Sequence, residues 1–167
     1  MAKTFISYAR KDGDFVLKLA QDLRAAGADI WLDQLDIPAG ANWVRTIQQA
    51  LEQCGALIVV LSPTSVQSDN VLDEVLFARQ NKKSILPVLH QPCAIPFHLL
   101  STQHIDFTLK YDPALQKLLA VLPDGTASPV AKRTVRLLRS SPDKKISLDG
   151  VKAMLKKHNL HDAVHNK

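Results

Sequence analysis

The chain has 167 residues, of which 46% are hydrophobic, so it is long enough for one domain with a packed core and a further appendage. Its net charge of +5 is unevenly distributed: residues 1–127 hold 11 Lys and Arg against 13 Asp and Glu, whereas residues 128–167 hold 10 against 3. The main body therefore lacks the basic excess that is typical of a nucleic-acid groove.

The first residues and the cysteines point to one cellular compartment. The N-terminus enters a strand-like run directly, without the features of a signal peptide. No apolar segment approaches the roughly 18 residues that a membrane-spanning helix requires. The two cysteines, Cys54 and Cys93, do not suggest the framework of a disulfide-rich secreted fold. We therefore expect a cytoplasmic protein without membrane association.

Strands and helices alternate along the main body. Five short apolar runs predict strands at residues 4–8, 28–32, 56–61, 84–89 and 104–107. Apolar residues at helical spacing predict helices after the first, second, third and fifth of these strands, and one short helical turn is expected near residues 97–100. An alternation of this kind indicates a parallel sheet covered by helices on both faces.

Capping residues predict where the helices begin and end. Asp12 is expected to cap the first helix, and Gly27 is expected to end it. Ser68 or Asp69 is expected to cap the third helix. In the last helix, Asp112 is expected to be the cap and the following proline the first helical residue.

Three further expectations concern the segments around these helices. Residues 33–40 contain a proline and a glycine, which predict a loop. Cys54 falls on the apolar face of the second predicted helix, at residues 43–54, and is expected in the core. Pro87 lies inside the fourth predicted strand, where a missing N–H group favours a bulge or partial pairing.

Loops at the carboxyl ends of the strands are where an open parallel sheet binds its ligands. Residues 7–11, 33–42 and 62–68 are expected to meet at this edge. Arg10 and Lys11 could hold a phosphate or pyrophosphate there, or could simply be solvent-facing charges.

Other residues near this edge bear on three kinds of site: a stacking surface for a planar base, a glycine-rich phosphate-binding loop and a divalent-cation site. Tyr8, Trp31 and Trp43 could stack on a planar base, although a tryptophan is more often part of the core. The segment after the first strand has neither the glycines of a phosphate-binding loop nor the acidic cluster that would hold a divalent cation.

Glu74 is a carboxylate near the carboxyl end of the third predicted strand. On the third predicted helix it borders the apolar arc that includes Val71, Leu72, Val75 and Ala78, whereas Asp73 points away from it. A half-sheltered carboxylate there is a candidate catalytic acid or base. From periodicity alone, a solvated glutamate on an ordinary helix is the favoured interpretation.

Residues 126–167 are predicted to form a basic helical tail or a linker to a further domain. Nucleic acid or acidic lipid could bind such a tail, but a solvated helical face is the more common case. His158, His161 and His165 share helical spacing, yet the chain offers no defined set of metal ligands around them. We expect no metal site.

Four motifs follow one another in register along the main body. The motifs are Phe5-Ile6-Ser7-Tyr8; Trp31-Leu32-Asp33 with the following loop and Trp43; residues 58–63 with Ser68 and Glu74; and residues 95–97 with 103–107. Together they cover roughly residues 3–123 and resemble the TIR domain family (Toll/interleukin-1 receptor/resistance), in the family's order and at sensible intervals.

This resemblance implies a flavodoxin-like five-stranded parallel sheet over residues 1–125 and one of two activities. In the first, the domain hydrolyses NAD, which is then a substrate and not a cofactor, and is activated by self-association in immune or antiphage defence signalling. In the second, it is a scaffold that signals through TIR–TIR assembly without turnover. Nucleic acid is not an expected partner of the domain itself.

The resemblance also implies roles for individual residues. Glu74 matches the essential glutamate of the enzymatic members, where it would face the nicotinamide ribose as nicotinamide leaves. The other implied substrate-binding residues are Ser7, Tyr8, Arg10, Asp33, Ser62 and Asn70. An assembly or gating role is implied for the segment that resembles the family's BB loop, which comprises Asp36, Ile37, Pro38, Ala39, Gly40 and Trp43.

Asn70 departs from the family's pattern. Many members carry an aromatic residue, usually tryptophan, four positions before the glutamate. Residues four apart on a helix share a face, so Asn70 is expected to shape the same pocket wall as Glu74. The departure bears on the apolar wall of a nicotinamide subsite and favours weak or assembly-dependent activity.

Overall fold

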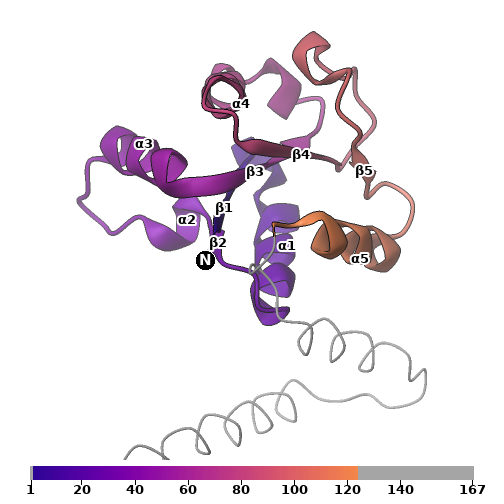
Figure 1. Ribbon diagram of the computed structural model, residues 1–167, viewed down its shortest axis with the longest axis horizontal. Coiled ribbons are helices and arrows are strands. Elements are labelled where there is room, and N and C mark those ends of the chain that lie inside the picture. Colours follow the sequence, from indigo (N-terminus) through magenta and orange to yellow (C-terminus); the bar gives the residue numbers. More distant parts are fainter. Residues whose placement is uncertain (1, 124–167) are drawn as a thin grey trace, which may run out of the picture. The chain divides into compact units, whose positions relative to one another are not determined.

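A computed structural model describes residues 2–123 of the chain, and the predicted tail with its three histidines lies outside them. Five parallel strands form one sheet in the order β2-β1-β3-β4-β5 (Figure 1), the order of flavodoxin-like folds. The predicted fold class is therefore confirmed. The strands are β1 Lys3–Ser7, β2 Ile30–Trp31, β3 Cys54–Leu61, β4 Ser84–Leu89 and β5 Ile105–Asp106.

Within residues 2–123, five α-helices and three short 3-10 turns lie between and after the strands. The α-helices are α1 Gly13–Ala25, α2 Asp33–Asp36, α3 Trp43–Gln53, α4 Asp69–Gln80 and α5 Tyr111–Val121. The 3-10 turns are η1 Arg10–Asp12, η2 Ser65–Gln67 and η3 Phe97–Leu99, and the last confirms the short turn expected there.

The sheet has a core on each face. Because successive side chains of a strand point to opposite faces, Phe5 of β1 packs toward α3 and α4, whereas Ile6 packs toward α1 and α5. Figure 1 shows this division, with α1 and α5 on one side of the sheet and α3 and α4 on the other. The central strand β3 is buried along nearly its whole length, as a strand covered on both faces requires.

Several predicted helix ends are confirmed. The Ser68 hydroxyl accepts a hydrogen bond from the backbone N–H of Val71 at 3.4 Å and so caps α4. Gly27 follows the end of α1 with φ +89°, a left-handed conformation that glycine adopts without a steric cost. Its N–H donates to the carbonyl of Arg24, which is one of the helix's last acceptors.

Other expectations at helix ends were wrong in whole or in part. Asp12 occupies the N-cap position of α1 as predicted, but its side chain makes no capping bond, because it is buried and bonds to a distant loop. Residues 33–36 form one turn of helix, α2, before the loop that was predicted from residue 33 onward. The last helix, α5, starts at Tyr111, so Asp112 is its second residue and not its cap.

Two expectations about strands hold only in part. Cys54 is buried as predicted, but it is the first residue of β3 and not part of the preceding helix. Pro87 causes no bulge, since β4 pairs with β3 in one unbroken register from Ser84 to Leu89. The alternative expectation, partial pairing, is confirmed, because the other neighbour, β5, pairs only with Val88 and Leu89 and not with Pro87.

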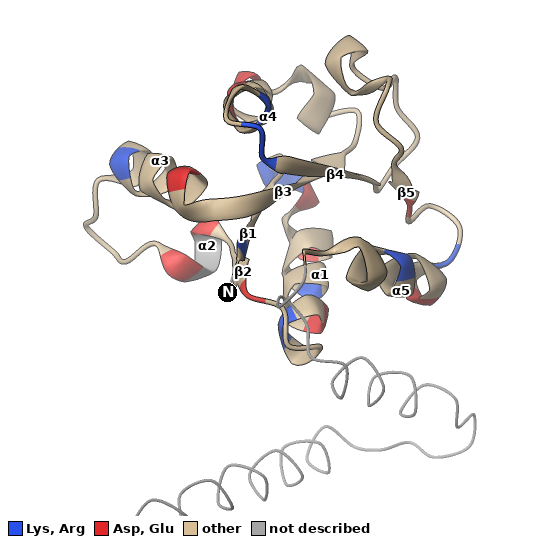
Figure 2. Ribbon diagram, viewed as in Figure 1, with Lys and Arg blue, Asp and Glu red and all other residues tan. Residues whose placement is uncertain are grey.

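Each of the helices α1, α3, α4 and α5 carries both acidic and basic side chains (Figure 2), so none of these four helices has charges of one sign only. Within residues 2–123, no helix is long and apolar enough to cross a membrane. Over the same residues, no three His, Cys, Asp or Glu side chains are grouped as metal ligands would be.

Candidate active site

A cleft of about 450 Å³ opens at the edge where the parallel strands end. It lies beside the switch point between β1 and β3, from which the chain continues in opposite directions along the sheet. The three loops expected to meet at this edge all contribute to it. Its lining consists of Tyr8, Ala9, Arg10, Lys11, Asp33, Trp43, Thr64, Gln67, Ser68, Asn70 and Glu74.

Glu74 reaches the cleft because α4 is anchored against the sheet. Val71, Val75 and Ala78 are buried on the helix face that packs on the core. Leu72 was expected in the same arc but is 38% exposed, so the buried face is narrower than predicted. Glu74 is half-buried at the edge of this face, one helical turn after Asn70, and both line the cleft.

Burial raises the pKa of Glu74 from 4.5 to about 7. Loss of hydration disfavours the charged form, and the negative charges of Asp33 and Asp73 act in the same direction. The hydroxyl of Ser7 opposes this rise in pKa as a nearby donor. A carboxyl group that changes its charge near neutral pH in a cleft is typical of catalytic sites.

Ser7 is the last residue of β1 and does not line the cleft. Its side-chain oxygen is buried, and among residues 2–123 it has no hydrogen-bond partner of good geometry. The hydroxyl is close enough to Glu74 to lower the pKa of its carboxyl group, but it does not face the cleft. This position differs from the direct substrate contact that was predicted.

Tyr8 and Asp33 form a second polar pair in the cleft. The Tyr8 hydroxyl donates to Asp33 Oδ1 at 2.6 Å, which joins the loop after β1 to the start of α2. Burial and the neighbouring carboxylate raise the pKa of Tyr8 well above its usual value, so the phenol stays protonated. Both residues lie where they were predicted.

Arg10 and Trp43 stand at the mouth of the cleft. The Arg10 guanidinium carbon lies 5.8 Å from the centre of the Trp43 ring, within the range of a cation–π contact. Trp43 is 39% exposed, and Lys11 adds a second exposed cation. The cleft therefore combines cations and an accessible aromatic ring at its mouth with a carboxyl group inside.

Two residues predicted near the ligand lie outside the cleft. Ser62 is completely buried, so a ligand in the cleft cannot reach its hydroxyl. Trp31, considered as a stacking surface, is instead in the core, where its ring stacks on Phe5 with a centroid separation of 4.8 Å.

Residues 36–40 do not line the cleft either. Asp36 accepts hydrogen bonds from Arg24 and from the backbone N–H of Leu32, each at 2.7 Å, and so fixes the start of this loop. The loop then leaves Pro38, Ala39 and Gly40 exposed.

Thr64, Gln67 and Ser68 line the cleft but were not predicted as ligand contacts. They belong to the loop between β3 and α4, which was expected at the binding edge. A loop that follows the carboxyl end of a central strand is itself the signal that could have identified them.

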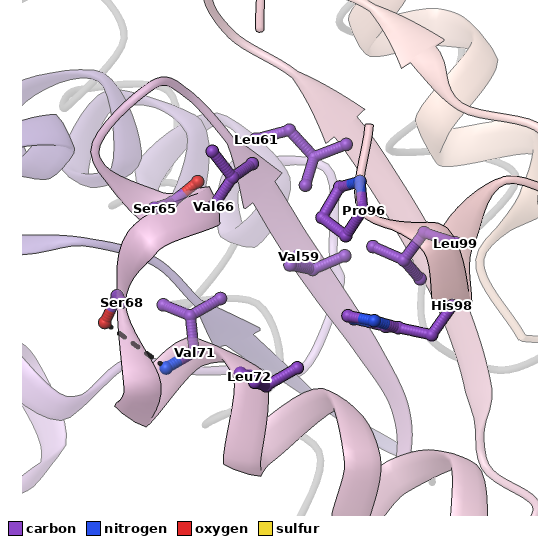
Figure 3. A pocket seen from close by; sticks show the side chains of 10 residues that line it. All are labelled: Val59, Leu61, Ser65, Val66, Ser68, Val71, Leu72, Pro96, His98 and Leu99. Atoms are coloured by element: carbon purple, nitrogen blue, oxygen red, sulfur yellow. Dashed lines mark hydrogen bonds between the residues drawn. The ribbon is translucent and has the colours of Figure 1, made fainter. Parts of the chain in front are cut away.

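Two further hollows border α4. One of about 260 Å³ runs between α3 and α4; it is lined by Val44, Ile47, Leu51 and Phe77 and shares Trp43, Asn70 and Glu74 with the cleft. The other, of about 20 Å³, lies between α4 and η3 and has room for no more than about one water molecule (Figure 3). The groove thus shares three lining residues with the cleft, whereas the small cavity shares Ser68.

The raised pKa of Glu74 gives a test that needs no substrate. In the unfolded chain the carboxyl group ionises near pH 4.5, but in the folded chain it keeps its proton to about pH 7. The free energy of unfolding therefore falls between these values and stays lower above them. We predict that Glu74→Gln stabilises the protein at pH 8 by on the order of 1–3 kcal/mol, with no gain at pH 4.

Chemical denaturation at both pH values would measure this difference. Asp73→Asn is the matched control, because it removes the adjacent exposed carboxylate and should change stability only slightly. An equal effect of the Glu74 substitution at the two pH values would contradict the assignment.

Similarity to known proteins agrees with this architecture. A model of the TIR domain family matches residues 4–119. The TIR domain of the Toll-related receptor TRR-2 from Hydra magnipapillata superposes with a TM-score of 0.62 at 25% identity, covering 70% of this chain and 94% of that one. The RPS4 and RRS1 TIR heterodimer, at 16% identity and a TM-score of 0.51, shares the fold, and the match covers 71% of this chain and 93% of that one.

Two curated relatives are bacterial proteins. A protein of Paracoccus denitrificans named NAD(+) hydrolase PdTIR is 37% identical over 92 residues, which are 52% of this chain and 31% of that protein. A protein of Bacteroides thetaiotaomicron named 2' cyclic ADP-D-ribose synthase BtTIR is 29% identical over 122 residues, 70% of this chain and 39% of that protein. The chain thus spans well under half of either relative. With the family match, the strand order and the four motifs in agreement, this chain belongs to the TIR domain family.

Proposed function

We propose that this TIR domain is an NAD+ nucleosidase, which cleaves NAD into nicotinamide and a linear or cyclic ADP-ribose product. The observation that carries the proposal is the half-buried Glu74 carboxyl group, with a pKa raised to about 7, in the cleft at the switch point. The names of the two bacterial relatives support this substrate and these products.

The cleft suits the parts of a dinucleotide. Its volume of about 450 Å³ falls in the range of small-molecule sites. Arg10 and Lys11 at the mouth would pair with the pyrophosphate, and the exposed Trp43 ring would stack on a planar base. The carboxyl groups of Glu74 and Asp33 can accept hydrogen bonds from ribose hydroxyls.

The reaction then requires little acid catalysis. The bond between the ribose anomeric carbon and the nicotinamide nitrogen breaks, and its electron pair goes to that nitrogen, which becomes neutral. The ribose is left as an oxocarbenium-like cation, which the Glu74 carboxylate stabilises at close range. Water completes hydrolysis, or a hydroxyl of the same ADP-ribose attacks to form a cyclic product; in both cases the attacking oxygen loses a proton.

This role requires the ionised form of Glu74. With a pKa of about 7, the carboxylate is present in only about half of the molecules at neutral pH. An arriving cationic nicotinamide ring lowers the pKa of a neighbouring carboxyl group, because opposite charges favour ionisation. Substrate would therefore generate the form that the reaction uses.

Self-association is the second part of the proposal. Pro38, Ala39 and Gly40 are exposed beyond the lining of the cleft, so this loop is free to contact another copy of the domain. Asn70, exposed where many family members carry an aromatic residue, leaves the cleft open to the groove between α3 and α4. Contacts from a neighbouring copy would enclose this wall and raise activity.

We extend this to a cytoplasmic role in immune or antiphage defence signalling, on the strength of the family resemblance. A non-catalytic scaffold is the second candidate, favoured by the same exposed loop and by Asn70. Tyr8, Arg10, Asp33 and Asn70 remain proposed substrate contacts, and we propose no cofactor.

The catalytic assignment predicts the effect of a single substitution. Glu74→Gln keeps the side chain's shape but removes its negative charge, so nicotinamide release from NAD should fall by about 10²–10³-fold. Asp73→Asn, the neighbouring exposed carboxylate, should retain activity close to the parent. Chromatographic measurement of nicotinamide with the folded, concentrated proteins tests this, and equal activity of the Glu74 variant and the parent would refute the role.

The assembly proposal makes a separate prediction about protein concentration. Specific activity and oligomer mass should both rise with protein concentration. A bulky charged residue in place of the exposed Pro38 should shift the midpoint of the activity curve and the midpoint of the mass curve to higher protein concentration. Light scattering and turnover on the same samples provide the measurement. Oligomers that form without any nicotinamide release would favour the scaffold, whereas activity independent of concentration would exclude activation by assembly.

A further inference from the structure

A buried hydrogen bond lies behind the cleft. The Ser62 hydroxyl donates to Asp12 Oδ2 at 2.5 Å, across 50 residues of sequence. Both side chains are buried, Asp12 at 5% exposure and Ser62 at 0%. The length is that of a hydroxyl–carboxylate bond, among the strong hydrogen bonds of proteins.

The same hydroxyl also organises the loop after β3. Ser62 Oγ accepts from the backbone N–H of Ser65 at 3.1 Å, while the Ser62 N–H donates to Ser65 Oγ at 2.8 Å. Ser62 therefore fixes the turn from which the loop proceeds to the cleft-lining residues Thr64 and Ser68.

Asp12 organises the opposite side. It ends the 3-10 turn whose other two residues, Arg10 and Lys11, line the mouth of the cleft. Its second oxygen faces the end of β4, where His90 Nε2 lies 3.9 Å from Asp12 Oδ1. The His90 ring stacks on Phe15 of α1 at a centroid separation of 4.0 Å, which holds that end of the pair in place.

We propose that Asp12 and Ser62 are positioning residues: their buried hydrogen bond joins the cleft wall that carries Arg10 and Lys11 to the wall that carries Thr64 and Ser68. Neither side chain lines the cleft, so neither contacts the substrate. Breaking the bond lets the two cations move relative to the rest of the site. We therefore expect weaker binding of the pyrophosphate. Glu74 keeps its place because Val71, Val75 and Ala78 also hold α4 against the core.

This inference rests on the proposed function in one respect, that the ligand contains a pyrophosphate. Its test uses the full 167-residue chain and two readouts: KM and kcat for nicotinamide release, and the dissociation constant of ADP-ribose by calorimetry. ADP-ribose has the pyrophosphate but no bond to be cleaved, so its binding reports the cation wall whether or not the protein turns over NAD.

Ser62→Ala and Asp12→Ala should each raise KM and the ADP-ribose dissociation constant about tenfold. In both variants kcat should stay within about twofold, since transition-state contacts of Glu74 are kept. Asp12→Asn should bind nearly as the parent does, because its amide oxygen can still accept from Ser62. If Asp12→Ala does not fold, Ser62→Ala and Asp12→Asn decide the question.

Ser65→Ala is the matched control. It removes an equally buried hydroxyl from the same loop but leaves the bond between the two walls, so both constants should stay within about twofold of the parent. Three results would overturn the proposal. The Ser65 and Ser62 variants could weaken ADP-ribose binding equally, the Ser62 and Asp12 variants could lose kcat at unchanged KM, or the parent could fail to bind ADP-ribose. Absence of nicotinamide release with the predicted ADP-ribose results would overturn only the nucleosidase assignment.

Discussion

The parallel pairing of β1 with β3 is the constraint on which the candidate site depends. The two strands pair in parallel from Thr4 opposite Ala56 to Ser7 opposite Val59, so the loops that follow β1 and β3 start at the same edge of the sheet. From there the chain turns to α1 on one face and to α4 on the other. The loops that diverge leave a cleft between them, and the polar residues of both loops line it.

Glu74 shows how burial at this edge couples stability to chemistry. The sheltered position raises its pKa to about 7, which costs folding free energy whenever the group is charged. The same shelter strengthens the interaction of the carboxylate with a developing cation, since the surroundings screen it less than water does. A hidden hydroxyl, that of Ser7, partly offsets the cost. Under the proposed function, the position that lowers stability is also the position that favours catalysis.

Sequence reasoning could predict the sheet, the strand edge and Glu74, because alternating apolar runs and ordered motifs carry that information. Local spacing suggested a helix cap for Asp12, and the family resemblance implied a ligand contact for Ser62, but neither could show that the two side chains bond to each other across 50 residues. The motifs pointed to Glu74, but helical periodicity alone favoured a solvated glutamate at this position. Helical spacing carries no information about the neighbouring loops that shelter the side chain. Long-range contacts and burial, in contrast to local patterns, required the structure.

The central claim is that the ionised Glu74 carboxylate acts on NAD. The most direct measurement is the pH dependence of kcat/KM for nicotinamide release, set beside a ¹³C NMR titration of the Glu74 carboxyl carbon in the free protein. Both measurements should show one ionisation near pH 7. As the pH increases, kcat/KM should rise through this value and stay constant above it. A carboxyl group that titrates near 4.5, or a rate that is constant from about pH 5 to 8, would contradict the account.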